Sequence, residues 1–223
     1  MKVYVQQYCA LGRQYLLIKS IYMMAENAAH NRRSIDEKQT TGGARMIAII
    51  DYDAGNIKSV EKALHYLGEE TVVSRDPQVL LSADKVILPG VGSFGDAMNN
   101  LNKFGLVPVI RELTEKGTPF LGICLGLQLL FESSDETPGV EGLGILKGKI
   151  VKIPPAPGLK IPHMGWNSLH LQNDGRLFKG IPEETYVYFV HSYYLQAKEP
   201  EIVKATAQYG VTIHASVEKD NIF

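Results

Sequence analysis

A cysteine flanked by two glycines is the residue best placed for chemistry in this 223-residue chain. The run is Gly122-Ile123-Cys124-Leu125-Gly126-Leu127-Gln128, between an apolar strand-like run at 119–123 and a helical run at 125–132. Such glycines let a chain turn sharply from strand to helix and leave the side chain between them exposed. The helix start offers N–H groups to an oxyanion, and its dipole favours a thiolate. The pattern predicts that Cys124 is a nucleophile; the alternative is a small apolar core residue.

A glycine-rich loop follows another apolar run, Lys85-Val86-Ile87-Leu88. Its sequence is Pro89-Gly90-Val91-Gly92-Ser93-Phe94-Gly95. Open α/β sheets bind ligands at the carboxyl ends of their strands, and glycines let backbone N–H groups approach a substrate carbonyl closely. The loop is therefore a candidate oxyanion site. A phosphate-binding loop and an ordinary strand-to-helix turn are the alternatives.

The elements that must position these two segments alternate between strand and helix from Met46 onward. Continuous apolar runs predict buried strands, and apolar residues at helical spacing predict the helices between them. We expect strands at 46–51, 71–73, 85–88 and 119–123, and helices at 57–67, from about 94, and at about 107–116. Alternation of this kind favours a parallel sheet with helices on both faces.

Strand-like runs come closer together after Lys147, with fewer helices between them. They lie at 149–153, 166–171, 185–190, 202–208 and 212–216. Close spacing favours antiparallel pairing. The predicted fold is therefore a flavodoxin-like α/β domain, whose mixed and mostly parallel sheet has an antiparallel extension.

Composition and charge exclude several classes of function. The formal net charge is −1, which gives no reason to expect nucleic acid or an anionic membrane as a partner. Two cysteines, Cys9 and Cys124, can form one disulfide at most, so a reducing, cytoplasmic compartment is expected. No run approaches the roughly 18 to 20 apolar residues of a spanning helix. No group of His, Cys, Asp or Glu has metal-ligand spacing, so neither a metal nor a cofactor is expected.

Residues 1–45 differ in composition from the rest of the chain. They contain seven basic and three acidic residues, and polar residues dominate 31–45. We expect an extension outside the domain that is poorly ordered or loosely attached. It could be a targeting peptide, because such peptides are basic, or an extension without a role. The domain itself is expected to span 46–223.

Five separated motifs give the chain a specific resemblance. They are the loop at 89–94, the cysteine run at 122–128, Pro-His-Met-Gly-Trp-Asn at 162–167, Tyr-Phe-Val-His-Ser-Tyr-Tyr at 188–194, and Ile-Ile-Asp-Tyr-Asp-Ala-Gly-Asn at 49–56. The first two resemble class I (triad) glutamine amidotransferases. The other three look like those of the glutaminase subunit of imidazole glycerol phosphate synthase. The resemblance runs from Met46 to Phe223.

The resemblance implies a role for particular residues. Cys124 would attack the side-chain amide of glutamine and form a thioester. The oxyanion and substrate site would comprise Gly90, Val91, Gly92, Leu125, Gln128, Ser192 and Tyr193. Gly55 and Asn56, in the turn 52–56, and Trp166 would meet a (β/α)₈-barrel cyclase subunit in a heterodimer, although a lone tryptophan beside a glycine is ordinarily a core residue. The cyclase would use the ammonia to form imidazole glycerol phosphate and aminoimidazole carboxamide ribotide in histidine biosynthesis.

One part of the family pattern does not occur in the printed sequence. A cysteine hydrolase needs a base and a carboxylate to orient it, and the family supplies both from a His-Pro-Glu run after its last strands. The sequence ends at Phe223 without that run, so we expect a C-terminally truncated domain. His214 has no glutamate two residues later, and His163 and His191 are expected to be structural.

Three alternatives to this function remain open at the level of sequence. The chain could be another class I amidotransferase or a γ-glutamyl hydrolase, against which the run 162–167 argues. It could be a truncated, non-catalytic remnant that binds its partner. A flavin-binding flavodoxin is the third alternative, but the first turn, 52–56, lacks a phosphate-binding run of Ser and Thr.

Overall fold

The computed structural model describes residues 46–172 and 174–223. The extension predicted over 1–45 lies outside the described residues. Within them, no helix is long and apolar enough to cross a membrane.

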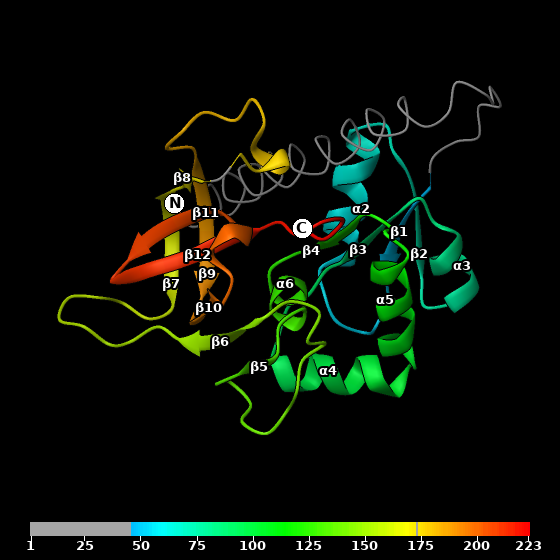
Figure 1. Ribbon diagram of the computed structural model, residues 1–223, viewed down its shortest axis with the longest axis horizontal. Coiled ribbons are helices and arrows are strands. Elements are labelled where there is room, and N and C mark those ends of the chain that lie inside the picture. Colours follow the sequence, from blue (N-terminus) through cyan, green and yellow to red (C-terminus); the bar gives the residue numbers. More distant parts are fainter. Residues whose placement is uncertain (1–45, 173) are drawn as a thin grey trace, which may run out of the picture.

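A four-stranded parallel sheet, which we call the central sheet, lies beside the group of later strands at 148–217, β6 to β12 (Figure 1). Its order is β2-β1-β3-β4, with β1 at Met46–Ile50, β2 at Glu70–Ser74, β3 at Lys85–Leu88 and β4 at Phe120–Gly122. Three of these strands, β1, β3 and β4, are almost entirely buried, which explains why their sequences are continuously apolar. The predicted parallel sheet is therefore confirmed.

Alternate residues of the central strands face two separate hydrophobic clusters. Ala48 and Ile50 pack in a cluster with α3 (Pro77–Ser82), α4 (Phe94–Lys103) and α5 (Leu106–Glu115). Ile47 and Ile49 pack in another cluster with Val60 and Leu64 of α2 (Ile57–Tyr66). The two-residue period of a strand therefore places helices on both faces of the sheet, as predicted.

The strands after residue 132 form three smaller sheets, so the predicted antiparallel part of the fold is present as sheets separate from the parallel one. They are β10-β6-β5, β12-β11-β8 and β7-β9. The strands are β5 (Ser133–Ser134), β6 (Gly148–Lys152), β7 (His163–Ser168), β8 (His170–Leu171), β9 (Tyr186–His191), β10 (Tyr193–Ala197), β11 (Val203–Tyr209) and β12 (Val211–Val217), with short 3₁₀ helices at Arg176–Phe178 and Pro200–Ile202. Pairing is antiparallel except between β5 and β6.

The last residues of the chain lie against β4, the strand that leads to Cys124. Phe120 N donates to Asn221 O at 2.8 Å, and Gly122 N donates to Phe223 O at 2.9 Å. The bridge between Phe120 and Ile222 is parallel. This segment therefore lies along the edge of β4 in the central sheet.

Candidate active site

Cys124 lies in a strained turn between β4 and α6 (Leu125–Leu129). Its backbone has φ 55° and ψ −110°, a conformation that costs free energy in a residue with a Cβ, and its side chain is exposed. Strained residues of this kind concentrate at functional sites, where the surrounding structure holds them in place. The sharp turn predicted from the sequence is present.

The two glycines around Cys124 are required by close backbone contacts. A Cβ on Gly126 would lie 1.8 Å from the carbonyl oxygen of Leu88 in β3. A Cβ on Gly122 would lie 2.7 Å from Cα of Leu127. Both distances are shorter than atomic packing allows, so any side chain at either position would displace the turn. The glycine spacing is thus a direct consequence of how tightly β4 and α6 pack.

The helix after Cys124 is shorter than predicted. It ends at Leu129 rather than continuing to Glu132, because Ser133–Ser134 pairs with β6 and Glu132 N donates to Gly148 O. A helix of five residues has few aligned peptide dipoles, so its dipole contributes less to a thiolate than predicted. Backbone N–H groups close to Cys124 remain the local source of positive potential.

The glycine-rich loop packs directly on this turn. A Cβ on Gly90 would lie 2.8 Å from both Gly126 N and Leu125 Cβ, so the two predicted oxyanion segments touch. Val91 is 55% exposed, and Gly92 is exposed with φ 103°. The candidate oxyanion residues Gly90, Val91, Gly92 and Leu125 are therefore brought together at the carboxyl edge of the sheet.

A buried tyrosine holds the glycine-rich loop, and sequence reasoning gave it no role in the site. Tyr52 Oη donates to Pro89 O at 2.7 Å. A Cβ on Gly90 would lie 2.7 Å from Tyr52 Oη, so the phenol also packs against this glycine. Burial is the main cause of a raised pKa for Tyr52, and the charge of Cys124 adds to it. The phenol therefore stays protonated and keeps its donor. The feature of the sequence that could have indicated this role is the pair Asp51-Tyr52, directly after a buried strand.

The predicted substrate residues meet between α6 and β10. Gln128 Nε2 lies 3.4 Å from the carbonyl oxygen of Tyr193, to which it donates. Ser192 O accepts from Ile153 N at 2.9 Å. Residues up to 65 positions apart in sequence thus lie close together here, namely Gln128, Ser192 and Tyr193.

The three histidines considered as bases have different surroundings. His163 is buried and its Nδ1 lies 3.0 Å from Nε2 of His191. His191 Nδ1 lies 2.9 Å from Tyr193 O. His214 in β12 accepts at Nδ1 from Ala197 N at 3.1 Å. Each imidazole therefore has a defined partner: a side chain for His163, and backbone groups for Nδ1 of His191 and of His214.

The predicted interface residues divide between two regions. Trp166 is 48% exposed on β7, where it contacts Tyr188 edge to face at 5.6 Å between ring centroids. Asn56 is exposed, whereas Gly55 is half-buried and packs toward Pro89. Tyr52 is fully buried, so its inclusion in an exposed turn was wrong: its ring is needed under the glycine-rich loop. Trp166 is also not the core residue of the alternative interpretation.

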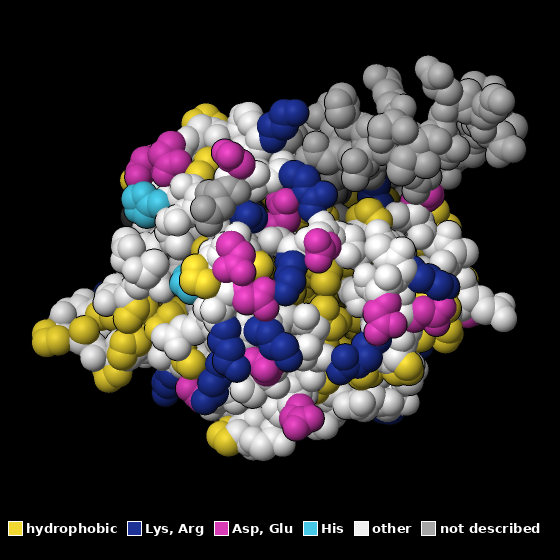
Figure 2. Space-filling view, in the orientation of Figure 1, with side chains coloured by type: hydrophobic (Ala, Val, Ile, Leu, Met, Phe, Trp, Pro, Cys, Tyr) yellow, Lys and Arg dark blue, Asp and Glu magenta, His cyan; other side chains and the backbone are white. Residues whose placement is uncertain are grey.

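An exposed apolar face runs along the β7-β9 sheet. Register places Met164 opposite Val190 and Trp166 opposite Tyr188, and Tyr186 lies further along the same face of β9. Met164, Trp166, Tyr186 and Val190 are 43% to 60% exposed. Elsewhere, Figure 2 shows Lys and Arg mixed with Asp and Glu on the visible face, without a broad patch of one sign. We call Met164, Trp166, Tyr186, Tyr188 and Val190 the β7-β9 apolar face.

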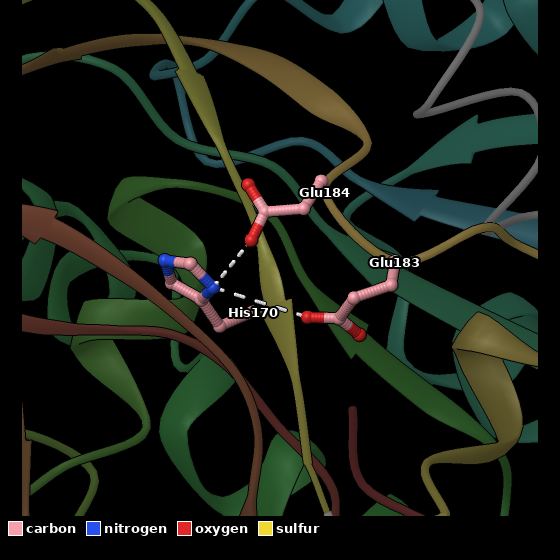
Figure 3. A group of neighbouring side chains, drawn as sticks. All are labelled: His170, Glu183 and Glu184. Carbon is pink, nitrogen blue, oxygen red and sulfur yellow. Dashed lines mark ion pairs between the residues drawn. The ribbon is translucent and has the colours of Figure 1, made fainter.

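One group of potential metal ligands exists among the described residues, although sequence spacing did not reveal it (Figure 3). His170 Nδ1 lies 2.8 Å from Glu184 Oε1 and 3.9 Å from Glu183 Oε1. The histidine comes from β8 and the glutamates from the turn before β9, so the fold brings together residues distant in sequence. All three side chains are at least 40% exposed. An exposed contact between an imidazole and carboxylates accounts for this arrangement, and we assign no metal to it.

Comparisons with known proteins agree with the geometry. Residues 48–223 match the family model for class-I glutamine amidotransferases. Imidazole glycerol phosphate synthase subunit HisH of Moorella thermoacetica is 51% identical over 179 residues, covering 80% of this chain and 84% of that protein. The HisH subunit of Aquifex aeolicus is 50% identical over 175 residues, covering 78% and 84%.

Solved structures show the same fold at lower sequence identity. A crystal structure of a glutamine amidotransferase superposes with a TM-score of 0.56 at 19% identity, covering 73% of this chain and 85% of that one. A glutamine amidotransferase from Thermotoga maritima gives 0.56 at 16% identity, covering 81% and 74%. The chain belongs to the class I glutamine amidotransferases and, within them, to the family of imidazole glycerol phosphate synthase subunits HisH.

Proposed function

We propose that this chain hydrolyses glutamine to glutamate and ammonia, as the glutaminase subunit of an imidazole glycerol phosphate synthase, with Cys124 as the nucleophile. The single observation that carries the proposal is the strained, exposed backbone of Cys124 at the turn from β4 into α6. The 51% identity to a HisH subunit supports glutamine as the substrate and histidine biosynthesis as the pathway.

The chemistry follows from the position of the thiol. The sulfur of Cys124, as thiolate, adds to the side-chain carbonyl carbon of glutamine, and the oxygen becomes an oxyanion. Backbone N–H groups of the 90–92 loop and of Leu125 stabilise that charge. As the tetrahedral adduct collapses and the C–N bond breaks, the leaving nitrogen takes up the proton that the catalytic base accepted from the thiol, and it departs as neutral ammonia. Water then hydrolyses the γ-glutamyl thioester, giving glutamate and regenerating the thiol.

The base in this scheme comes from the family pattern. In that pattern a histidine and a glutamate lie in a His-Pro-Glu run, which does not occur among the 223 residues. Asn221–Phe223 pairs in parallel with β4, so residues placed after Phe223 would continue toward the sheet edge that carries Cys124. A polypeptide that carries the run there would bring an imidazole toward the thiol.

Glutamine would be held by groups on both sides of Cys124. Gln128 and the backbone of Ser192 and Tyr193 are the candidates to bind its α-amino and α-carboxylate groups. Their support is the contact between Gln128 Nε2 and Tyr193 O, which joins the helix of the nucleophile to β10. The reacting amide would then extend toward Cys124 and the 90–92 loop.

The ammonia would pass to a cyclase subunit with a (β/α)₈ barrel. The β7-β9 apolar face supports this assignment, because exposed aromatic clusters mark protein interfaces. Asn56 and Gly55, beside the glycine-rich loop, are proposed as a second part of the same interface. An enclosed route would keep the ammonia from dilution and protonation in bulk water.

The test combines covalent labelling with turnover. The chain is treated with 6-diazo-5-oxo-L-norleucine, a glutamine-shaped electrophile, and the adduct is located by mass spectrometry. We expect one adduct, on Cys124, with glutamine protecting against it. Glutamate release is then measured with the cyclase subunit, for the 223-residue polypeptide and for one extended through the His-Pro-Glu run. The extended polypeptide should turn over, its Cys124→Ala variant should not, and the shorter one should be far slower.

Two outcomes would contradict the proposal. An extended Cys124→Ala polypeptide that keeps full activity would show that another residue forms the thioester. Labelling that is neither saturable nor slowed by glutamine would show that the site does not bind glutamine, leaving a non-catalytic, partner-binding protein as the better description.

A further inference from the structure

Two histidines that the proposed reaction does not use form a chain of contacts that ends in the glutamine site. His163 Nδ1 lies 3.0 Å from His191 Nε2, and His191 Nδ1 lies 2.9 Å from the carbonyl oxygen of Tyr193. The same carbonyl oxygen accepts from Nε2 of Gln128 at 3.4 Å. One carbonyl thus receives two donors, from β9 and from α6.

The acceptor at the end of the chain fixes which nitrogen carries each proton. A carbonyl oxygen can only accept, so His191 Nδ1 must carry a hydrogen and donate to Tyr193 O. In a neutral imidazole the other nitrogen then accepts, so Nε2 of His191 takes a hydrogen bond from Nδ1–H of His163. The direction of both hydrogen bonds therefore follows from the Tyr193 carbonyl.

The surroundings of the pair keep both rings neutral and in place. Burial lowers the pKa of His163 to about 4, with a further contribution from His191, and burial also lowers the pKa of His191. The ring of His163 stacks on Phe189 at 4.6 Å and on Tyr209 of β11 at 3.8 Å between centroids. His163 and His191 also face each other directly across β7 and β9. The two imidazoles are therefore part of a closely packed layer of rings.

Two successive peptide groups beside the glutamine site are held by different elements. Ser192 O accepts from Ile153 N, just after β6, which fixes the peptide between Ser192 and Tyr193. The next peptide, whose oxygen belongs to Tyr193, is held by His191 and Gln128. Tyr194, on the other side of this peptide, pairs with Val151 of β6. Loss of the donor on His191 would remove the short hydrogen bond to the Tyr193 oxygen and leave that oxygen with the long contact to Gln128.

We propose that His191 is a positioning residue for glutamine binding: its Nδ1–H orients the Tyr193 carbonyl, and His163 sets the tautomer of His191 that makes this possible. The inference rests on the proposed function, because it assigns the Ser192–Tyr193 backbone to the amino-acid end of glutamine. It also gives the β7-β9 sheet two separate tasks. The face with His163 and His191 supports the substrate site, and the opposite face carries Trp166.

The experiment compares two variants of nearly equal size. Asparagine at position 191 places an N–H at the distance of Nδ1 from the backbone, whereas leucine has no donor. For the full chain, the inhibition constant of 6-diazo-5-oxo-L-norleucine at Cys124 is measured from the saturable rate of labelling. We expect His191→Leu to raise this constant about tenfold, as the loss of one hydrogen bond implies, and His191→Asn to stay close to the wild type. His163→Phe keeps a stacking ring without the donor and should raise it to a smaller extent.

Labelling of Cys124 by iodoacetamide separates positioning from general damage. This small reagent does not use the amino-acid clamp, so its rate should be the same in all four proteins, and thermal unfolding shows that each is folded. Equal inhibition constants for His191→Leu and His191→Asn would overturn the role of the Nδ1–H. An unchanged constant for His163→Phe would overturn the role of His163. Failure of the wild type to label saturably would instead contradict the proposed function, so the two failures are distinguishable.

Discussion

The phenol oxygen of Tyr52 donates a hydrogen bond of 2.7 Å to the carbonyl oxygen of Pro89, the residue before the candidate oxyanion glycines. Tyr52 is fully buried at the carboxyl end of β1, and Pro89 follows β3. The hydrogen bond therefore ties two neighbouring strand ends together where the backbone must present its N–H groups. Tyr52 therefore helps to fix the conformation of the glycine-rich loop, although it does not itself react.

Replacing Tyr52 with phenylalanine removes this hydrogen bond and little else. We expect kcat for glutamine hydrolysis to fall about tenfold with KM nearly unchanged, because the loop acts on the oxyanion rather than on the bound amino acid. Steady-state glutamate release by the extended polypeptide with the cyclase subunit measures both constants. Tyr66→Phe, at an 82% exposed tyrosine, is the control and should have no effect. A change in KM alone would place Tyr52 in substrate binding instead.

A single methyl group at position 126 should disrupt the turn. In Gly126→Ala the new Cβ would meet the Leu88 carbonyl at 1.8 Å, so β3 and α6 would have to separate. We expect a loss of about 3 kcal/mol or more in the free energy of unfolding, measured in urea. Gly117→Ala is the comparison, because its φ of 79° is strained but its Cβ would meet open space, and it should cost about 1 kcal/mol. Equal losses would show that β3 and α6 accommodate the methyl group.

Trp166 should contribute to association and not to folding. Its side chain is about half exposed, so Trp166→Ala should change the free energy of unfolding by less than about 1 kcal/mol. The same variant should weaken binding to the cyclase subunit by about 2 kcal/mol or more, measured by titration calorimetry. Tyr66→Ala, an exposed aromatic residue on α2, serves as the matched control and should bind normally. Unfolding of Trp166→Ala with unchanged affinity of the folded fraction would refute the assignment.

Acid should destabilise the protein first through its buried histidines. The pKa of His163 falls from 6.5 to about 4 on folding, so between these values the unfolded state binds the extra proton. Stability is therefore complete above pH 6.5 and is lost as the pH falls toward 4. The lowered pKa values of His191 and His214 act in the same direction. Glu132, whose pKa is lowered to about 2 by Lys198 and the Gly148 N–H, acts in a separate window below about 4.5.

The pH effect can be assigned by substitution. Urea unfolding at several values between pH 7 and pH 4.5 should show a loss of roughly 1 to 2 kcal/mol from His163 in the wild type. His163→Phe should lose less over the same range, while Tyr209→Phe, which keeps both the imidazole and the stacking ring, should follow the wild type. Parallel curves for all three proteins would mean that His163 does not titrate in this window.

The sequence predicted the parts of the fold that depend on local pattern. The runs Met46–Ile50 and Lys85–Leu88 are apolar because both faces of the central sheet are covered, so their strands could be recognised from composition alone. The turn at Cys124 could also be predicted. Gly122 and Gly126 are required where β4 and α6 pack closely, and this glycine spacing is typical of a sharp turn from strand to helix. In these cases the residues that determine the local structure are close to one another in sequence.

The features that were missed depend on contacts between distant residues. No strand was expected at Tyr193–Ala197, because it forms by pairing with β6, whose residues lie more than 40 positions earlier. The helix after Cys124 ends early because β6 competes for the following residues. Tyr52 gained a role through a partner 37 positions away, and the His163–His191 pair through one 28 positions away. Sequence spacing does not encode such encounters.

The position of Asn221–Phe223 has a consequence for the order in which the protein assembles during synthesis. Asn221 Nδ2 donates to Thr118 O across 103 positions, and Phe223 closes the hydrogen-bonding edge of β4. As the chain leaves the ribosome, this edge of β4 stays unpaired until about a hundred more residues have been made, a stretch that includes the strands of the three smaller sheets. Pairings of such long range are slow to form, so the nucleophile turn is among the last regions to gain its full support. A nascent chain would therefore carry an exposed strand edge beside its reactive thiol, and chaperone binding is expected at β4 until residues 221–223 have been made and have paired with it.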